Sequence, residues 1–352
     1  MTAMGGRLVL LAVSIVATLV VLELGCRLAL GRYYLRHWPN LVLDLREGAT
    51  RYAQQVTIHD PELGFTPRPG HVRPDGTHDA DGMRSTPPLA GVPDRPLLLA
   101  TGDSFTYGEE VDDGDTWPSQ LQALLRVRVV NGGVGAYGLA QIVLRTERLA
   151  RAQRPQPIVV SFIADDLRRG ELSRFVGFDK PHFVPTAGGL ALAPGPVPPP
   201  VPARQTLSFW HHALGWSALV DAVLSRIGWP EDWPYDSVRV LPSGSGERMA
   251  CPLMKRLATL ALPLLVVAQY DPAAWQGDAT AAEQRRQAKA VLHCAEQAGL
   301  AALDTYEAFT AAAGRQGPQQ LFAPQGHLDA RGNAIIARIV ADALKRSGMV
   351  AP

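Results

Sequence analysis

The sequence predicts an α/β fold, an open parallel sheet with helices on both of its faces. Two observations favour this class. Short apolar runs recur along the chain, as in strands that are buried on both faces. Helical stretches separate the runs, and alternating strands and helices indicate parallel pairing.

Five apolar runs are expected to form the strands. They are residues 96–101 (PLLLAT), 127–131 (VRVVN), 158–163 (IVVSFI), 264–269 (LLVVAQ) and 300–304 (LAALD). The helices expected between them include residues 117–126, 139–152 and 281–298.

Size and composition limit the function classes. The chain has 352 residues, more than one average domain, but a single α/β domain with an insertion accommodates most of this length. Hydrophobic residues make up 47% and charged residues 19%, and the formal net charge is +1. This composition favours neither long disorder nor a charge-driven nucleic-acid surface, so no nucleic-acid partner is expected. The oligomeric state stays open.

The N-terminus predicts a membrane anchor over residues 1–32. Residues 8–22 are uncharged and apolar, and residues 24–30 extend the run past Glu23, which makes it just long enough to span a bilayer. Because no convincing small-x-small cleavage site follows, we expect an uncleaved signal anchor.

Basic residues flank this segment unevenly. Arg7 precedes it, whereas Arg27, Arg32 and Arg36 lie at its end or follow it. Taken alone, the positive-inside rule therefore favours a cytoplasmic domain.

Two further segments interrupt the strand–helix pattern. Residues 33–94 are rich in Pro, Gly and His and predict a mostly irregular lead-in with a hairpin. Residues 168–245 form an insertion with a proline-rich stretch (PGPVPPPVPAR) and aromatic residues near Trp210 and Trp229. The insertion is interpreted either as a lid or as a polyproline linker with a few packed aromatic side chains.

The three cysteines lack the spacing of a tetrahedral metal site, so neither a structural zinc ion nor another cofactor is expected. Cys251 and Cys294 form one disulfide if the domain is exported, or remain two buried thiols. Cys26 lies in the anchor.

The first expected strand leads into the residues TGDSF, with Ser104 in the fourth position. Ligands of open α/β sheets bind beyond the carboxyl ends of the strands, so Ser104 stands where a nucleophile belongs. The tripeptide Gly102-Asp103-Ser104 within it is also typical of an ordinary turn in which Asp103 or Ser104 caps the next helix.

Three further segments lie at strand ends or before the last helix. They are residues 131–138 (NGGVGAYG), 162–167 (FIADDL) and 326–333 (GHLDARGN). Together with TGDSF, and in this order, they resemble the sequence blocks of the SGNH/GDSL hydrolase superfamily, especially its membrane-tethered bacterial members. The resemblance covers roughly residues 95–170 and 260–348. It implies a flavodoxin-like, three-layer SGNH hydrolase domain over residues 95–350.

The resemblance also implies roles for individual residues. Ser104 would be the nucleophile and His327 the general base that takes its proton. The oxyanion would be held by the backbone N–H of Ser104, by a backbone N–H of the glycine-rich turn at Ala136, and by an asparagine amide at the position of Asp165.

Three positions depart from the family pattern. Ala136 replaces a glycine, but keeps its N–H. Asp165 replaces the asparagine, and a carboxylate donates a hydrogen bond only if a buried site raises its pKa enough to keep it protonated. The acid commonly found two or three residues before the histidine is missing, because Gln325 and Pro324 occupy these positions.

Several groups remain candidates for orienting His327. They are Asp329, Asp304 and Asp271, or a backbone carbonyl that would leave a Ser–His dyad.

The expected function is a serine esterase or deacetylase that removes acyl groups, such as acetyl, from an extracytoplasmic glycan or lipid through an acyl-enzyme on Ser104. The domain is expected outside the cytoplasm by analogy with the family, against the count of basic residues. An O-acyltransferase that uses the same intermediate is one alternative. The other is a non-catalytic envelope protein that binds glycans or assists assembly.

Overall fold

The computed structural model describes residues 3–73, 76–186, 189–193, 195–228, 233–236, 238–241 and 246–351. The chain forms two compact units. Unit 1 combines Met1–Gln55 with Pro200–Arg239, and unit 2 combines Val56–Pro199 with Val240–Pro352.

Unit 2 contains a five-stranded sheet in the order β14-β13-β7-β5-β6. All of its neighbouring strands are parallel. The strands are β5 (Leu97–Thr101), β6 (Arg128–Asn131), β7 (Ile158–Phe162), β13 (Leu264–Ala268) and β14 (Ala301–Asp304). Every residue of the three inner strands is buried, whereas β6 and β14 at the edges are partly exposed. The predicted fold class and all five predicted strands are confirmed to within a residue.

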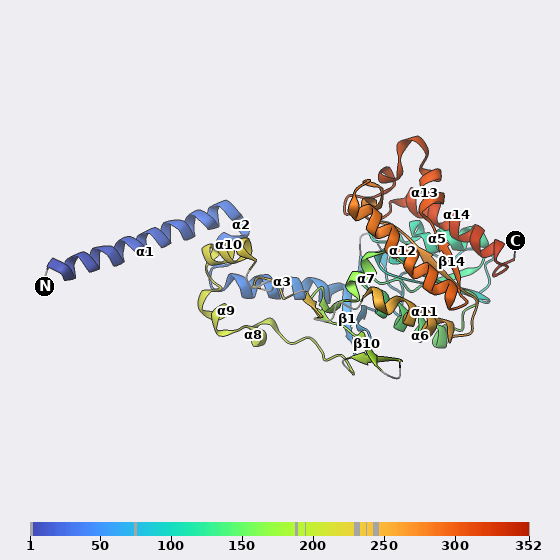
Figure 1. The fold of residues 1–352 in the computed structure, drawn as a ribbon, viewed down its shortest axis with the longest axis horizontal. Coiled ribbons are helices and arrows are strands. Elements are labelled where there is room, and N and C mark those ends of the chain that lie inside the picture. The colour runs from blue at the N-terminus through green and yellow to red at the C-terminus, as the bar shows by residue number, and fades with distance from the viewer. Residues whose placement is uncertain are drawn as a thin grey trace. The chain divides into compact units, whose positions relative to one another are not determined.

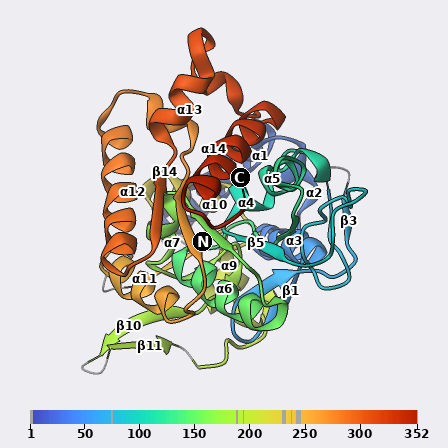
Figure 2. The same cartoon turned by 90° about the vertical axis from the view of Figure 1, so that its right-hand side faces the viewer.

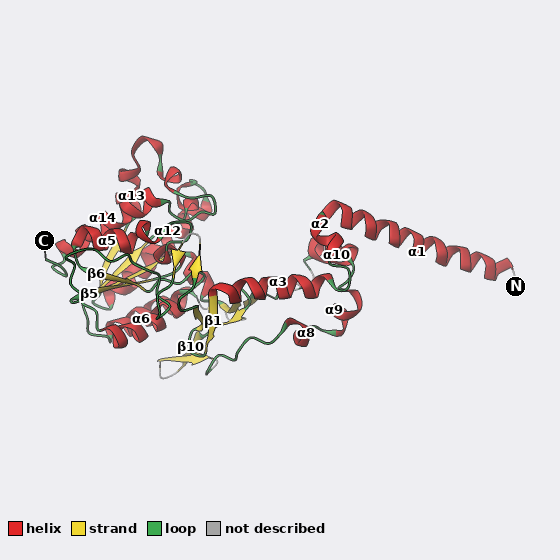
Figure 3. Ribbon diagram, turned by 180° about the vertical axis from the view of Figure 1, so that it is seen from behind, coloured by secondary structure: helices red, strands yellow, loops and turns green. Residues whose placement is uncertain are grey.

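Helices cover both faces of this sheet (Figures 2 and 3). On one face, α5 (Trp117–Leu125), α13 (Tyr306–Ala313) and α14 (Ala330–Arg346) pack on a core that includes Leu98, Val159 and Val267. The other face carries α6 (Leu139–Gln153), α11 (Ala250–Ala258) and α12 (Ala279–Gln297). A disulfide between Cys251 and Cys294 joins α11 to α12, while Cys26 is a free cysteine.

The order of the strands determines where a site can form. The chain passes from β5 to β6 on one side, and β7 then pairs with β5 on the other side. The carboxyl ends of β5 and β7 therefore border a topological switch point, the usual ligand position in open α/β sheets.

Unit 2 also includes short strands outside the main sheet. β1 (Thr57–Asp60) and β2 (Gly64–Pro67) form the hairpin predicted in the lead-in, and β3 (Val72–Arg73) pairs with β4 (Gly76–Thr77). The other short strands are β8 (Leu172–Phe175), β9 (Phe178–Asp179), β10 (His182–Thr186) and β11 (Gly189–Ala193), and β12 (Arg239–Val240) begins at the last residue of unit 1. Single 3-10 turns occupy Asp113–Asp115, Glu247–Met249, Pro272–Trp275, Gly314–Gln316 and Pro318–Leu321.

Unit 1 is helical (Figure 1). It holds α1 (Ala3–Leu30), α2 (Arg32–Arg36), α3 (Leu41–Val56), α8 (Ala203–Thr206), α9 (Phe209–Leu214) and α10 (Ala218–Ile227). Thus the lead-in is not mostly irregular, because α3 begins within it, where the Asn40 side chain accepts a hydrogen bond from Leu43 N at 2.8 Å. Residues 200–239, part of the predicted insertion, group with the N-terminal helices in this unit.

Within α1, the segment Gly5–Leu30 contains an 18-residue stretch with a mean hydropathy of 2.6, and the segment is long and apolar enough to cross a membrane. An N-terminal signal sequence has the same properties.

Candidate active site

Ser104 lies at the carboxyl end of β5, as the sequence predicts. It is the first residue of α4 (Ser104–Tyr107), and the Asp103 side chain accepts a hydrogen bond from Phe105 N at 3.0 Å. A Cβ on Gly102 would lie 2.8 Å from the carbonyl oxygen of Ser161 in β7, so only glycine permits this tight passage from strand to helix. Ser104 itself is 5% exposed.

Three side chains form a line of hydrogen bonds that starts at this serine. Ser104 Oγ lies 3.0 Å from Nε2 of His327, and Nδ1 of His327 lies 3.1 Å from Oε2 of Glu110. Both His327 and Glu110 are largely buried. The structure therefore brings together the two residues predicted to react and adds an acid that the sequence did not identify.

The Glu110 carboxylate is held by the turn that carries His327. It accepts backbone hydrogen bonds from Gln325 N at 2.9 Å and from His327 N at 3.2 Å. Its own backbone is in the left-handed region, with φ at 67°, two residues after Gly108, which caps the C-terminal end of α4. The acid that the family places two or three residues before the histidine is thus replaced in space by an acid 217 residues away in the sequence.

The three aspartates considered for this role make other contacts. Asp329 caps α14 through Gly332 N at 2.8 Å and pairs with Arg331. Asp304 accepts hydrogen bonds from the Tyr270 hydroxyl and from Tyr306 N.

Asp271 accepts hydrogen bonds from Ala273 N at 2.8 Å and from the Gln284 amide. Within the part of the chain that the structure describes, the carboxylate at His327 is that of Glu110.

The glycine-rich turn after β6 lies beside the serine. Asn131 joins the two segments, because its amide donates to Thr106 O at 2.9 Å and its oxygen accepts from Gly133 N at 3.0 Å. A Cβ on Gly135 would lie 4.0 Å from Ser104 Cβ. Ala136 follows with φ at 66°, an angle that favours glycine, so the replacement of glycine costs about 1 kcal/mol of backbone strain.

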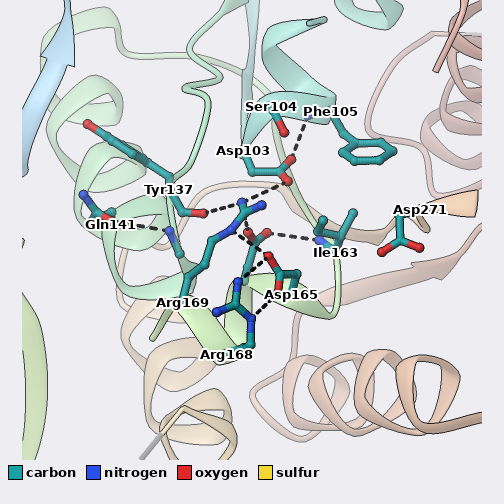
Figure 4. A network of polar contacts seen from close by, with 12 residues as sticks. Asp103, Ser104, Phe105, Tyr137, Gln141, Ile163, Asp165, Arg168, Arg169 and Asp271 are labelled. Atoms are coloured by element: carbon teal, nitrogen blue, oxygen red, sulfur yellow. Dashed lines mark hydrogen bonds and ion pairs between the residues drawn. The ribbon is translucent and has the colours of Figure 1, made fainter. Parts of the chain in front are cut away.

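Asp165 does not meet the condition for an oxyanion donor. Burial alone would raise its pKa, but hydrogen bonding from Arg168 and the charge of Arg169 outweigh this effect, and the pKa of Asp165 is lowered. Its carboxylate contacts Arg168 at 2.6 Å and Arg169 at 2.9 Å, as Figure 4 shows. An ionised carboxylate only accepts hydrogen bonds, so this side chain supplies no donor for an oxyanion.

A buried charge cluster lies next to Ser104 (Figure 4). Arg169 contacts Asp166 at 2.9 Å and Asp103 at 3.6 Å, and it donates to Tyr137 O at 3.0 Å. Burial and then the charge of Asp103 raise the pKa of Asp166 well above its usual value. Burial likewise raises the pKa of Asp103, in spite of the nearby Arg169. The cluster links Asp103, which precedes the serine, to α7 (Asp165–Arg169) at the end of β7.

No group of three or more His, Cys, Asp or Glu side chains that could hold a metal ion occurs among the described residues.

Known structures resemble the chain over about seven tenths of its length. LAE5, an α/β hydrolase enzyme from the metagenome of Lake Arreo, Spain, is 16% identical, with a TM-score of 0.44 over 71% of this chain and 94% of its own. Axe2, an acetylxylan esterase from Geobacillus stearothermophilus, is 14% identical, with a TM-score of 0.44 over 72% of this chain and 95% of its own.

A lipolytic G-D-S-L family member from Veillonella parvula is 17% identical, with a TM-score of 0.39 over 71% of this chain and 98% of its own. No protein-family model and no curated sequence matches the chain. Similarity at this level assigns no activity to the chain, so function is argued below from the contacts of Ser104.

Proposed function

We propose that unit 2 is a serine esterase of the SGNH type that hydrolyses ester-linked acyl groups through an acyl-enzyme on Ser104. The contact of 3.0 Å between Ser104 Oγ and His327 Nε2 carries this proposal. A serine hydroxyl is a weak nucleophile until a base within hydrogen-bond reach accepts its proton. His327 is that base, and Glu110 is the positioning residue that holds its ring through Nδ1.

The reaction then follows in two steps. Ser104 Oγ attacks the acyl carbonyl while its proton passes to His327, which returns a proton to the leaving alcohol. Water, activated by the same imidazole, attacks the acyl-enzyme and releases the acid. The Ser104 N–H and the turn around Gly135 and Ala136 are the proposed oxyanion donors, each worth about 3 kcal/mol. Asp165 has no part in this step.

The proposed substrate class is an acylated glycan or lipid outside the cytoplasm, with acetyl as the simplest acyl group. α1 is the proposed membrane anchor, supported by its length and hydropathy. The disulfide between Cys251 and Cys294 supports a compartment in which thiols are oxidised.

The test is covalent labelling of the full-length chain in detergent with a small fluorophosphonate. The parent is compared with Ser104→Ala and His327→Ala, and with Ser225→Ala, which changes an exposed serine of α10. We expect Ser104→Ala to abolish labelling, His327→Ala to reduce it strongly, and Ser225→Ala to leave it unchanged. Absence of labelling in the folded parent, beside a serine esterase that is labelled, would contradict an activated serine.

A further inference from the structure

Two charged residues in the apolar helix α1 make contacts within unit 1. Glu23 is 6% exposed and Arg27 is fully buried. Their side chains pair at 2.7 Å. Charged groups in a membrane helix are costly unless they are paired and hydrogen-bonded. What these two residues bind therefore shows what lies against this end of α1.

Glu23 binds the start of α10. Its carboxylate accepts hydrogen bonds from the Ser217 hydroxyl at 2.7 Å, from Ala218 N at 2.9 Å and from Leu219 N at 3.0 Å. The first N–H groups of a helix have no partner within the helix, and the positive end of the helix dipole favours a carboxylate. Because α1 provides this carboxylate, α10 is held directly against α1.

Arg27 binds the chain on either side of this junction. It donates to the carbonyl oxygens of Tyr34 and Trp216. Figure 1 shows α2 and α10 beside the C-terminal end of α1. The C-terminal end of α1 is thus part of the fold of unit 1, which favours a retained anchor over a cleaved signal sequence.

The length of α1 sets the depth of this junction. The 18 steps from Gly5 to Glu23 span about 27 Å at about 1.5 Å per residue, close to the ~30 Å of a bilayer's hydrocarbon core. If α1 crosses a membrane from Gly5 onward, Glu23 and the start of α10 lie where hydrocarbon gives way to headgroups.

The elements around this junction expose large apolar side chains. We call six of these residues the interface patch: Trp38 (54% exposed), Phe209 (74%), Trp210 (62%), Trp216 (41%), Val223 (50%) and Ile227 (66%). Three of the seven tryptophans of the chain belong to it. Tryptophan is enriched at the boundary between membrane and water because its ring is amphipathic.

Exposed basic residues accompany the patch. Arg32 and Arg36 belong to α2, Arg204 belongs to α8 and Arg226 belongs to α10. Basic side chains beside an apolar surface are attracted to anionic headgroups. The positive charge of these elements and their continuity with α1 therefore favour the lipid bilayer as the surface that covers the interface patch.

We propose that residues 200–228, together with residues 31–38 after α1, lie in the headgroup region of the bilayer that α1 crosses. The interface patch is then in contact with lipid. This inference rests on the proposed anchor but is independent of the esterase activity. It gives this part of the insertion a role other than that of a lid or a linker.

Spin-label accessibility tests the proposal in the full-length chain. After Cys26→Ser, the two remaining cysteines are held in the disulfide, so single labels can be placed at Trp210→Cys, Val223→Cys and Ile227→Cys.

Two further labels serve as references. Val16→Cys in α1 is the membrane reference, and Leu124→Cys in unit 2 is the matched exposed apolar reference at 46% exposure. The proteins are reconstituted in vesicles of phosphatidylcholine and phosphatidylglycerol. Collision with oxygen is compared with collision with a water-soluble nickel chelate.

We expect the three patch labels to favour oxygen over the nickel reagent, as Val16→Cys does, and Leu124→Cys to favour nickel. Patch labels that behave like Leu124→Cys while Val16→Cys reports lipid would overturn the proposal and leave the anchor intact. Dipolar broadening between patch labels would overturn it in favour of a second copy of the chain. A water-exposed label at Val16→Cys would overturn the anchor and this inference together, whereas fluorophosphonate labelling reports on the esterase separately.

Discussion

The position of Glu110 shows that the carboxylate beside the histidine of the candidate active site comes from a distant part of the chain. The residues before His327 offer no acid, yet the imidazole contacts a carboxylate at 3.1 Å. That carboxylate follows the helix of Ser104, so one short segment carries both the proposed nucleophile and the acid. The left-handed backbone of Glu110 costs about 1 kcal/mol or more, and the two hydrogen bonds that its carboxylate accepts from Gln325 N and His327 N help to maintain it.

This arrangement predicts that Glu110→Gln lowers kcat by about 10²- to 10⁴-fold, because an amide neither stabilises an imidazolium nor fixes its tautomer. Hydrolysis of p-nitrophenyl acetate by the purified full-length chain measures the effect. Asp329→Asn is the matched control. It is expected to leave both kcat and Tm close to the parent values, because the asparagine side-chain oxygen caps α14 about as well as the aspartate does. The reverse pattern would assign the orienting role to Asp329.

The neighbouring carboxylates Asp165 and Asp166 predict opposite effects of pH on stability. The pKa of Asp166 is raised in the fold by burial and by Asp103, so its contribution to stability is complete below about pH 4 and is lost as pH rises through the folded pKa. The pKa of Asp165 is lowered in spite of burial, by its arginine partners, so its contribution is present above about pH 4 and is lost as pH falls through the folded pKa.

Thermal unfolding of Asp166→Asn and Asp165→Asn from about pH 3 to pH 8 separates the two effects. The Tm of Asp166→Asn, relative to the parent, is expected to rise with increasing pH, because the amide replaces the protonated acid and does not ionise. The relative Tm of Asp165→Asn is expected to fall over the same range. Parallel curves for the two variants would contradict the charge assignment of the cluster.

At the scale of whole elements, the strands were predictable because burial on both faces leaves a continuous apolar run, as in residues 158–163. α3 was not predictable in this way, because Gly48 and many polar residues interrupt its apolar positions. Ser104 and His327 were found through local motifs next to a strand or a helix. Glu110 was missed because its partner is 217 residues away, although the missing acid before His327 indicated that a replacement was needed.

The contact between α1 and α10 predicts a local effect of Glu23→Ala. Without the carboxylate, the first N–H groups of α10 and the buried Arg27 lose their partner, which costs about 1 kcal/mol or more. Cleavage by trypsin at Arg204 and Arg226 in detergent is therefore expected to be about tenfold faster, since proteolysis follows the population of locally opened chain.

Thr18→Ala is the control for this experiment, because the Thr18 hydroxyl donates a hydrogen bond within α1, to Ser14 O at 2.8 Å. It is expected to leave the cleavage rate unchanged. Equal cleavage of the parent and Glu23→Ala would show that α10 does not depend on α1.

At the scale of the whole molecule, the disulfide between Cys251 and Cys294 stabilises the fold only in a compartment where thiols are oxidised. Cys251 and Cys294 are 43 residues apart, and closing a loop of this length restricts the unfolded chain by up to about 4 kcal/mol in the chain-entropy account. Such a bond persists outside the reducing cytoplasm. The basic residues after α1 favour the opposite orientation, with unit 2 in the cytoplasm. The two arguments conflict, and the redox state of these cysteines distinguishes between them.

We predict that Cys251 and Cys294 are oxidised in cells, because export exposes them to an oxidising environment. Cells that produce the full-length chain are quenched in acid, and free thiols are alkylated with a maleimide that adds mass before and after reduction. One thiol, that of Cys26, is expected to react before reduction and three after it. Cys251→Ser serves as the control, with two reactive thiols under both conditions and a lower Tm. Three reactive thiols in the unreduced parent would place unit 2 in a reducing compartment, and the count of basic residues would then give the correct orientation.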